Sequence, residues 1–270
     1  MGEVLQQATT KLTSISPTPR LDAELLLAHA LGITREALLL GPPRDAPPKF
    51  DALVRRRLAH EPVAYITGTK HFWTLELRVT PDALIPRPDS ETLIEAVIEH
   101  FGAKPPSTVL DLGAGSGALL LAALDHWREA WGLGIDRSAA ALAVARGNAK
   151  RLGFGERTRF LRGNWGDALD ARFDLILCNP PYIEADAALP PDVARHEPAS
   201  ALYAGPDGLD DYRRIAPQLP RLLAPGGIAV IEIGSEQAES VSALIRAEGM
   251  KVSVRKDLAG LDRCLGVTWR

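Results

Sequence analysis

The segment Asn179-Pro180-Pro181-Tyr182 interrupts a run of strand-forming residues with groups that could bind a planar amino group. Two consecutive prolines fix φ and remove two backbone donors, so a strand has to end there. The amide oxygen of Asn179 and the proline carbonyls can accept hydrogen bonds from an –NH2 group, and Tyr182 can add an aromatic wall. Such acceptors suit methyl transfer to an amide or aryl nitrogen, a poor nucleophile that must be oriented toward the electrophile. A plain turn after a strand is the alternative interpretation.

A second stretch, Val109 to Leu124, has the pattern of a strand, a glycine turn and a helix. Gly113, Gly115 and Gly117 would let the backbone approach a ligand closely, and the new helix offers unpaired N–H groups. The spacing is GxGxG rather than the dinucleotide fingerprint GxGxxG. Asp136 ends the next strand, 21 residues after Gly115, where a carboxylate can accept both hydroxyls of a ribose. The combination indicates a nucleoside-containing cofactor; tight packing around the glycines is the alternative.

Asn164 and Trp165 follow the next predicted strand. The indole of Trp165 could stack on an adenine while the amide of Asn164 hydrogen-bonds to it. A tryptophan that fills the core is the competing interpretation, because buried aromatic rings are common. The residues alone leave both interpretations open.

Strand-like and helix-like segments alternate through the part of the chain that carries these residues. The expected strands are TVLDLG, AWGLGID, RFLRG, FDLILCN, GIAVIEIG, KVSVRKD and CLGVTW, and the expected helices include GLDDYRRIAPQLPRLL and EQAESVSALIRAEG. Alternation at this spacing predicts βαβ units and a mainly parallel sheet with helices on both faces. We therefore expect an α/β fold with a doubly wound, seven-stranded sheet. A short turn between the last two strands predicts an antiparallel hairpin at one edge.

Residues 1–66 are predicted to form a small all-α domain. RLDAELLLAHALG carries leucines on a helical stripe and ends at Gly32, and Thr34 can cap the next helix. The proline-rich stretch GPPRDAPP, residues 41–48, predicts a break between helices. The helix that follows carries Arg55, Arg56 and Arg57, which indicate either a solvated face or a contact with a partner.

Residues 67–88 are predicted to connect this domain to the rest of the chain. TGTKHFWTLELRVT alternates apolar and polar residues, which indicates a β-hairpin, and the two prolines of LIPRPDSE make a rigid connector. Asp89 or Ser90 is expected to cap a helix that runs to about Phe101. The sheet domain is then expected to span residues 89–270.

The composition narrows the classes of protein. The chain has 270 residues, a formal net charge of −3 and a pI near 6.1, which argues against a protein built chiefly to hold nucleic-acid phosphates. Its two cysteines, Cys178 and Cys264, lack metal-ligand spacing and make a disulfide framework unexpected. No apolar run reaches the ~18–20 residues of a membrane helix, and the first residues lack a signal pattern. We expect a cytoplasmic protein without a membrane partner.

The GxGxG turn, the strand-end Asp136 and the NPPY segment together resemble class I S-adenosylmethionine-dependent methyltransferases that modify amino groups. More narrowly, GTKHFWTLELRVTPDALIPRPDSETLIE, DLGAGSGALLLAAL, NPPYI and HEPASALYAGPDGLDDYRRI resemble the release-factor glutamine methyltransferases, the HemK/PrmC family. The resemblance spans about residues 65–270, and a small helical N-terminal domain also fits that family. NPPY alone is shared with DNA and RNA amino-methyltransferases, whereas the IPRPDSE and HEP…DGLDDYR segments narrow the family.

The resemblance implies a substrate, a cofactor and a set of site residues. It implies methylation of N5 of the glutamine in the Gly-Gly-Gln loop of class 1 peptide chain release factors, with S-adenosylmethionine as cofactor and no metal. The residues expected to contact S-adenosylmethionine are Gly113, Ala114, Gly115, Ser116, Gly117, Asp136, Asn164, Trp165 and Asn179. Asn179, Pro180, Pro181 and Tyr182 would bind the glutamine amide, with Asn179, Pro180 and Tyr182 as the catalytic residues. His196 and Glu197 would order a loop over the site, and HEP is not a zinc motif because HExxH is absent.

Two other classes of function stay open at this point. One is a DNA or RNA amino-methyltransferase acting on adenine N6 or guanine N2, which the acidic pI and the absence of an evident basic domain disfavour. The other is a non-catalytic nucleotide-binding protein or a dehydrogenase, either of which would leave NPPY without a role. We expect no direct nucleic-acid substrate.

A Gly-Gly-Gln loop presents little surface, so the helical domain of residues 1–66 is expected to provide a second contact with the release factor.

Overall fold

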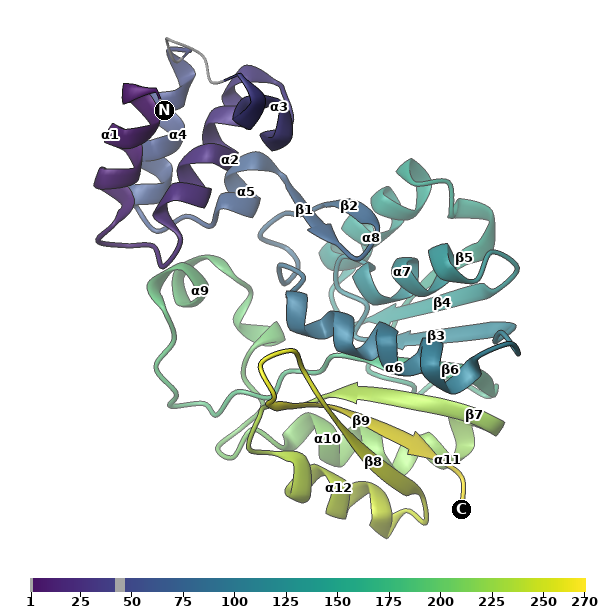
Figure 1. Ribbon diagram of the computed structural model, residues 1–270. Coiled ribbons are helices and arrows are strands. Elements are labelled where there is room, and N and C mark those ends of the chain that lie inside the picture. Colours follow the sequence, from purple (N-terminus) through teal and green to yellow (C-terminus); the bar gives the residue numbers. More distant parts are fainter. Residues whose placement is uncertain (1, 42–46) are drawn as a thin grey trace. The chain divides into compact units, whose positions relative to one another are not determined.

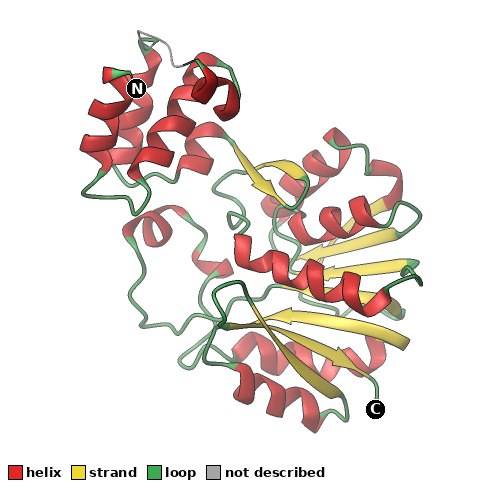
Figure 2. Ribbon diagram, viewed as in Figure 1, coloured by secondary structure: helices red, strands yellow, loops and turns green. Residues whose placement is uncertain are grey.

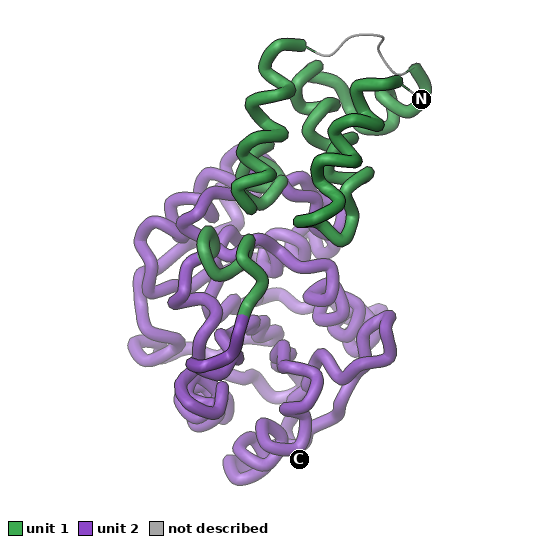
Figure 3. The backbone as a smooth tube through the Cα atoms, turned by 90° about the vertical axis from the view of Figure 1, so that its left-hand side faces the viewer, with its two compact units in different colours: residues 1–69, 189–197 green, residues 70–188, 198–270 purple. Residues whose placement is uncertain are grey.

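The computed structural model describes residues 2–41 and 47–270. These residues form two compact units, drawn in different colours in Figure 3. One unit contains residues up to Thr69 together with Leu189–Glu197, and the other contains Lys70–Ala188 and Pro198–Arg270. By compactness the chain therefore divides close to the expected end of the helical domain, and a short segment from the second half of the chain groups with that domain. The sequence patterns did not indicate this second feature.

The first unit is helical, as the leucine stripes predict. Its helices are α1 (Glu3–Leu12), α2 (Pro19–Leu31), α3 (Arg35–Leu40), α4 (Lys49–Leu58), α5 (Val63–Thr67) and α9 (Pro191–His196). Gly32 ends α2 in the left-handed conformation with φ 70°, and the Thr34 hydroxyl accepts a hydrogen bond from the Ala37 N–H at the start of α3. Both capping predictions are confirmed. Most of the predicted break at residues 41–48 lies outside the described residues.

Arg57 does not belong to a solvated face. Its side chain is buried, its Nε donates to Asp22 Oδ2 at 2.8 Å, and its Nη2 lies 3.8 Å from Asp192 Oδ2 on α9. A buried guanidinium needs such partners because an unpaired charge away from water is costly. Arg57 therefore holds α4, α2 and α9 together inside this unit, whereas its neighbour Arg56 pairs with Glu61 at the surface.

The second unit begins with the predicted hairpin, β1 (Thr69–Phe72) and β2 (Leu75–Arg78), in which β1 starts at the last residue of the first unit. A single 3-10 turn, Pro88–Ser90, leads into α6 (Glu91–Phe101). The predicted cap by Asp89 or Ser90 is confirmed in position only: Ser90 is the N-cap residue of α6, but its side chain makes no capping hydrogen bond. The Ser90 hydroxyl donates instead to Glu232, far along the chain.

A seven-stranded sheet forms the centre of this unit (Figure 2). Its strands are β3 (Thr108–Leu112), β4 (Trp131–Asp136), β5 (Thr158–Arg162), β6 (Phe173–Cys178), β7 (Leu223–Glu232), β8 (Lys251–Lys256) and β9 (Asp262–Thr268). The order is β5-β4-β3-β6-β7-β9-β8, with β3 to β7 parallel and β9 antiparallel to both of its neighbours. The predicted doubly wound sheet and its terminal hairpin are confirmed, and β9 lies between β7 and the edge strand β8.

Helices cover both faces of the sheet, because successive side chains of each buried strand point to opposite faces. Val109, Leu175 and Leu177 pack with α6, α7 (Ala118–His126) and α8 (Ala139–Arg151). Leu110 and Ile176 pack on the other face with α10 (Asp210–Ile215), α11 (Leu219–Leu222) and α12 (Ala238–Ala247), and the helices are seen in Figure 1. A 3-10 turn at Ala216–Gln218 separates α10 from α11, since the prolines in this stretch lack the N–H that a continuous helix needs.

Candidate active site

The strand order reverses between β3 and β6, and the two unusual turns of the sequence meet there. Leu112 at the end of β3 is paired with Cys178 at the end of β6. The chain after each strand therefore starts at the same level, so that Gly113 and Asn179 lie side by side. An added Cβ on Gly113 would lie 3.8 Å from the backbone oxygen of Asn179. Ligands of open α/β sheets bind at such a point, outside the carboxyl ends of the strands.

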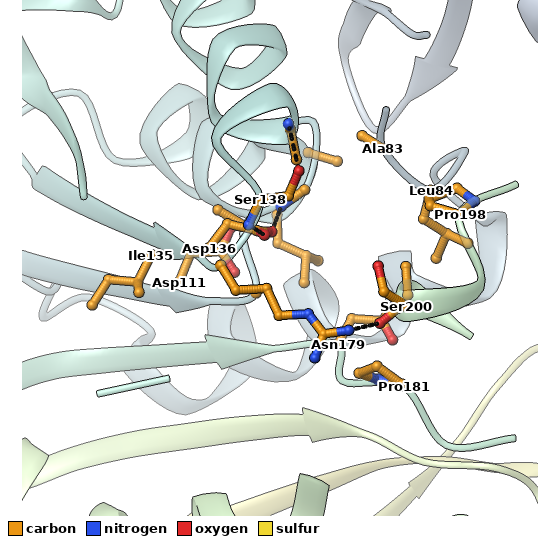
Figure 4. A pocket seen from close by; sticks show the side chains of 18 of the residues that line it. Ala83, Leu84, Asp111, Ile135, Asp136, Ser138, Asn179, Pro181, Pro198 and Ser200 are labelled. Atoms are coloured by element: carbon orange, nitrogen blue, oxygen red, sulfur yellow. Dashed lines mark hydrogen bonds between the residues drawn. The ribbon is translucent and has the colours of Figure 1, made fainter. Parts of the chain in front are cut away.

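A cavity opens at this edge of the sheet, with a volume of about 980 Å³ that includes open solvent at its mouth. Asp111, Asp136 and Asn179 come into it from three neighbouring strands, as Figure 4 shows. The predicted site residues that line it are Gly113, Ala114, Gly115, Asp136, Asn164, Trp165, Asn179 and Pro181. Ser116, Gly117, Pro180 and Tyr182 are not among the lining residues. The fold thus brings most of the predicted residues to one place.

The glycine turn combines close packing with open space. Gly113 has φ +80°, and a Cβ on it would lie 3.1 Å from the ring of Trp165. Gly115 has φ +53°, yet a Cβ there would meet nothing nearer than the Gly113 oxygen at 4.0 Å. Gly117 starts α7 with φ +84° and packs against Leu121 and Ala145. The tight-packing interpretation therefore holds at Gly117, whereas Gly115 borders free space.

Asp136 holds the glycine turn from the end of β4. Its Oδ2 accepts from the Gly115 N–H at 2.9 Å, and its Oδ1 accepts from the Ser138 N–H at 2.8 Å. These two bonds fix the plane of the carboxylate at the cavity wall. Each carboxylate oxygen has a further lone-pair site, so the group can still accept the two hydroxyls of a ribose.

Trp165 lies across Gly113 and is held by a second carboxylate. Its Nε1 donates to Asp211 Oδ1 at 3.3 Å, and its backbone has φ +51°, a conformation that is uncommon for a bulky residue. The indole both packs on the glycine turn and lines the cavity. Asn164, also at the cavity, donates through Nδ2 to Asp167 Oδ2 at 3.3 Å. Such a fixed aromatic edge beside open space suits the stacking of a flat ring.

The NPPY segment presents different groups to different sides. Asn179 lines the cavity and donates through Nδ2 to Ser90 Oγ at 3.2 Å. Pro181 also faces the cavity, whereas Pro180 is buried. Tyr182 directs its hydroxyl toward Glu232 Oε1, at 3.4 Å. Burial, with Glu232 nearby, raises the pKa of Tyr182 to about 12, so its hydroxyl keeps its proton at neutral pH.

Comparisons with known proteins agree with this geometry. Residues 3–68 match the family described as the PrmC N-terminal domain, and residues 103–260 match a methyltransferase domain family. The release factor glutamine methyltransferase of Rhodospirillum rubrum is 46% identical over 98% of this chain and 84% of its own. That of Caulobacter vibrioides is 43% identical over 92% of this chain and 89% of its own.

The chain belongs to the release factor glutamine methyltransferase family. A ribosomal protein L11 methylase from Lactobacillus delbrueckii subsp. bulgaricus shares the fold, with a TM-score of 0.53 and 23% identity over 72% of this chain and 85% of its own. The two relatives and the two family matches confirm the resemblance found in the sequence. Enzymes of this class use S-adenosylmethionine as the methyl donor.

The residues present fit that cofactor. The open space at Gly115 can admit the amino-acid chain of the cofactor. The fixed carboxylate of Asp136 can accept the hydroxyls of its ribose, and the indole of Trp165 can stack on its adenine. The cavity also contains a buried oxygen that has no hydrogen-bond partner, Oδ1 of Asp111. An unsatisfied buried carboxylate oxygen at a cavity wall is suited to a cationic ligand, since it otherwise keeps its full desolvation penalty.

The sequence patterns did not point to four polar residues at or next to the cavity. Ser90, Asp111 and Asp211 line it, and Glu232 accepts a hydrogen bond from Ser90. Asp111 and Glu232 are each 1% exposed and lie in apolar strands. Burial raises the pKa of each carboxyl to about 7, and smaller contributions come from the Leu120 N–H at Asp111 and from Ser90 at Glu232, which lower it. Each of the two carboxyl residues is a single acidic residue inside an apolar run of the sequence. This pattern could have indicated a buried carboxylate with a specific partner, because acidic residues are almost never buried without one.

His196 and Glu197 are not among the residues that line the cavity, and they belong to the segment that groups with the helical unit. His196 is the last residue of α9, and Glu197 is 6% exposed. The Arg56 side chain lowers the pKa of Glu61, and His196 adds a smaller effect in the same direction. Within residues 2–41 and 47–270, no cluster of three or more His, Cys, Asp or Glu side chains is arranged to hold a metal ion. None of the described helices is both long and apolar enough to cross a bilayer.

Proposed function

We propose that this protein transfers a methyl group from S-adenosylmethionine to the side-chain N5 of the glutamine in the Gly-Gly-Gln loop of class 1 peptide chain release factors. The observation that carries the proposal is the position of Asn179, which borders the same cavity as Asp136 and the glycine turn. A neutral amide acceptor at the end of β6 thus lies within one cavity of the groups that suit a nucleoside. Family membership supports the reaction and the substrate.

The cofactor is held, in this proposal, by the cavity residues from β3, β4 and β5. Asp136 accepts the ribose hydroxyls, Trp165 and Asn164 flank the adenine, and the glycine turn admits the chain between them. Asp111 offers its unpaired oxygen to a positively charged group. When bound, S-adenosylmethionine would supply a methyl group made electrophilic by its sulfonium sulfur, which keeps the electrons of the broken S–C bond and leaves as a neutral thioether.

The NPPY segment orients the glutamine amide. Its nitrogen lone pair is delocalised, so the nitrogen attacks only when its N–H groups are held and its lone pair points at the methyl carbon. Asn179 Oδ1 accepts one N–H hydrogen, and this bond strengthens as positive charge develops on nitrogen. Pro181, which lines the cavity beside Asn179, limits the space to one planar amide. The Pro180 carbonyl, the expected acceptor of the other hydrogen, and Tyr182 are not part of the cavity lining. The nitrogen becomes acidic once it is alkylated and loses one proton to solvent, so no strong base is required.

The helical domain of residues 1–66 provides the second contact with the release factor. A glutamine that reaches into a narrow pocket needs small neighbours, and two glycines let the backbone approach closely. A contact of that size buries far less than the ~1,200–2,000 Å² of a stable interface, so the enzyme must recognise its partner elsewhere as well. The match of residues 3–68 to a domain that carries this family's name supports that role.

The test is transfer of labelled methyl to an intact class 1 release factor and to a Gly-Gly-Gln peptide, with fragmentation to locate the modified atom. The proposal expects label on glutamine N5, and a kcat/KM at least ~10²-fold higher for the intact factor because of the second contact. The substrate is varied rather than the enzyme truncated, because residues 189–197 pack with the helical domain. Equal kcat/KM for both substrates would remove the second contact from the proposal.

A nucleic-acid substrate forms no part of this proposal, since the net charge is −3 and release factors are proteins that act in translation termination. The same partner places the reaction in the cytoplasm. Label found in DNA or RNA, and none on glutamine, would overturn the assignment.

A further inference from the structure

The amide of Asn179 can in principle lie in two orientations that exchange its oxygen and nitrogen. Only one of them offers the cavity an acceptor for the N–H groups of a substrate amide. In the structure Nδ2 is bonded to Ser90 Oγ at 3.2 Å, which directs Oδ1 away from Ser90. Both residues line the cavity. This orientation must be stabilised by the groups around Ser90.

The partners of Ser90 decide it. Its hydroxyl, 3% exposed, is a single donor and lies 2.5 Å from Oε2 of Glu232. An ionised carboxylate can only accept hydrogen bonds, so Ser90 must donate its one proton to Glu232. Ser90 Oγ can then only accept from Asn179, and it can accept from the amide nitrogen but not from the amide oxygen. The ionised Glu232 therefore fixes the orientation of the Asn179 amide through Ser90.

Glu232 also holds the other end of the NPPY segment. Its Oε1 accepts from the Tyr182 hydroxyl at 3.4 Å, and its backbone carbonyl accepts from the Tyr212 hydroxyl at 2.8 Å. β7 is paired with β6, and Glu232 directly follows the pair Cys178–Ile231. The carboxylate therefore lies beside the segment that it orients, on a buried strand of the sheet.

We propose that Ser90 and Glu232 are positioning residues for the methyl transfer, which fix the amide of Asn179 so that its carbonyl oxygen faces the substrate nitrogen. This inference rests on the proposed function, because it assigns the orientation of the group that holds the glutamine. Neither residue touches the substrate in this scheme. Their effect is transmitted through Asn179, with a smaller part through Tyr182.

The scheme makes the orientation depend on the protonation of Glu232. A protonated Glu232 can donate to Ser90 Oγ, which frees the Ser90 proton for the amide oxygen of Asn179 and permits the reversed orientation. Burial raises the pKa of Glu232 to about 7, the Ser90 bond, Arg263 and Tyr182 lower it, and Asp89 raises it. Cys178, Cys264 and Tyr212 also face this region and stay protonated near neutral pH, since burial raises the pKa of each. Turnover should therefore fall as the pH drops below about 7.

The experiment measures kcat with saturating S-adenosylmethionine and saturating release factor from pH 5.5 to pH 8.5. Ser90→Ala should lower kcat about tenfold or more, because the amide of Asn179 loses its only described acceptor and no longer has a preferred orientation. Glu232→Gln, which does not titrate, should lack the fall in kcat below pH 7 that the unmodified enzyme shows. Ser242→Ala is the matched control, since Ser242 is another buried serine, 1% exposed, whose hydroxyl has no partner. It should leave kcat unchanged.

Two further measurements separate positioning from a general structural role. The affinity for S-adenosylmethionine, measured by calorimetry, should change less than about threefold in Ser90→Ala, because Asp136, Asn164 and Trp165 are held by other partners than Ser90. The double variant Ser90→Ala/Asn179→Ala should be no slower than Asn179→Ala alone, because residues that act through one group are not additive.

Three results would overturn the inference while leaving glutamine methylation intact. They are a normal kcat in Ser90→Ala, a pH profile of Glu232→Gln identical to that of the unmodified enzyme, and additive losses in the double variant. Failure of the proposed function itself looks different, since the unmodified enzyme would then place no label on glutamine.

Discussion

Asp111 should make the affinity for S-adenosylmethionine depend on pH. The carboxyl is 1% exposed, Oδ2 accepts from the Leu120 N–H at 3.3 Å, and Oδ1 has no partner although it borders the cavity. Burial raises its pKa to about 7, with a further increase from Asp136. If the ionised form holds the cationic cofactor, the competent fraction falls from about nine tenths at pH 8 to about one tenth at pH 6. The apparent Kd should then rise about tenfold over that range.

The variant that tests this reasoning is Asp111→Asn, which keeps the shape and removes the charge. A hydrogen bond to a charged group contributes about 1.5–3 kcal/mol, so the variant should bind S-adenosylmethionine roughly 10- to 150-fold more weakly at pH 8. Its Kd should not change between pH 6 and pH 8. Calorimetry in two buffers of different ionisation enthalpy should show that binding to the unmodified protein at pH 7 releases about half a proton, and that binding to the variant releases none.

The free energy of unfolding should also depend on the protonation of Asp111. The unfolded carboxyl has its ordinary pKa of 3.8, so between about pH 4 and pH 7 the folded state holds a proton that the unfolded state has lost. The free energy of unfolding must therefore fall as pH rises through this window, by roughly 4 kcal/mol at most. Asp111→Asn should be at least as stable as the unmodified protein at pH 8. A pH-independent Kd in the unmodified protein, or an unchanged pH dependence in the variant, would refute the reasoning.

Three other predictions concern residues that the sequence singled out. Asp136→Ala should weaken S-adenosylmethionine binding by about 1.5–3 kcal/mol in calorimetry, and an unchanged affinity would exclude its contact with the ribose. Gly115→Ala and Gly153→Ala both place a side chain at positive φ (+53° and +83°), where no other atom is closer than about 4 Å. Both variants should therefore lose roughly 1–2 kcal/mol of stability in chemical unfolding. Only Gly115→Ala should also lose cofactor affinity, because Gly115 borders the cavity. Asn179→Ala should lower turnover at least ~10²-fold with the fold retained, whereas Asn179→Asp should keep partial activity; near-normal turnover in a folded Asn179→Ala enzyme would contradict its role.

The fold was predictable because its signals are local. Strand period, glycine turns and loop lengths define the βαβ units, and the strand-end positions of Asp136 and Asn179 follow from where apolar runs stop. Whether Asp136 and Asn179 lie in one cavity depends on strand order, which a doubly wound sheet fixes within narrow limits. Part of the cavity lining, including Asp136 and Asn179, could therefore be named before its geometry was known.

The residues that were missed depend on pairings between distant parts of the chain. Ser90 was read as a helix cap because its neighbours suggest one, but its partner Glu232 lies 142 positions away. Nothing in the local pattern distinguishes a serine that caps from one that bonds to a carboxylate on another element. Arg57 was likewise grouped with its exposed neighbours, since only the positions of Asp22 and Asp192 show that it is buried. Local periodicity carries no information of that kind.

Two carboxylates buried in one sheet should give the enzyme two separable dependences on pH. Asp111 on β3 lines the cavity, and Glu232 at the end of β7 accepts from the hydroxyl of Tyr182 in the NPPY segment. The pKa of each is raised to about 7, so protonation near neutrality should weaken cofactor binding through the first and slow the transfer step through the second. Saturation with S-adenosylmethionine abolishes the first effect and leaves the second. We therefore expect the two carboxyl groups whose pKa is raised by burial to act where ionisation orients the cofactor and the acceptor of the substrate amide.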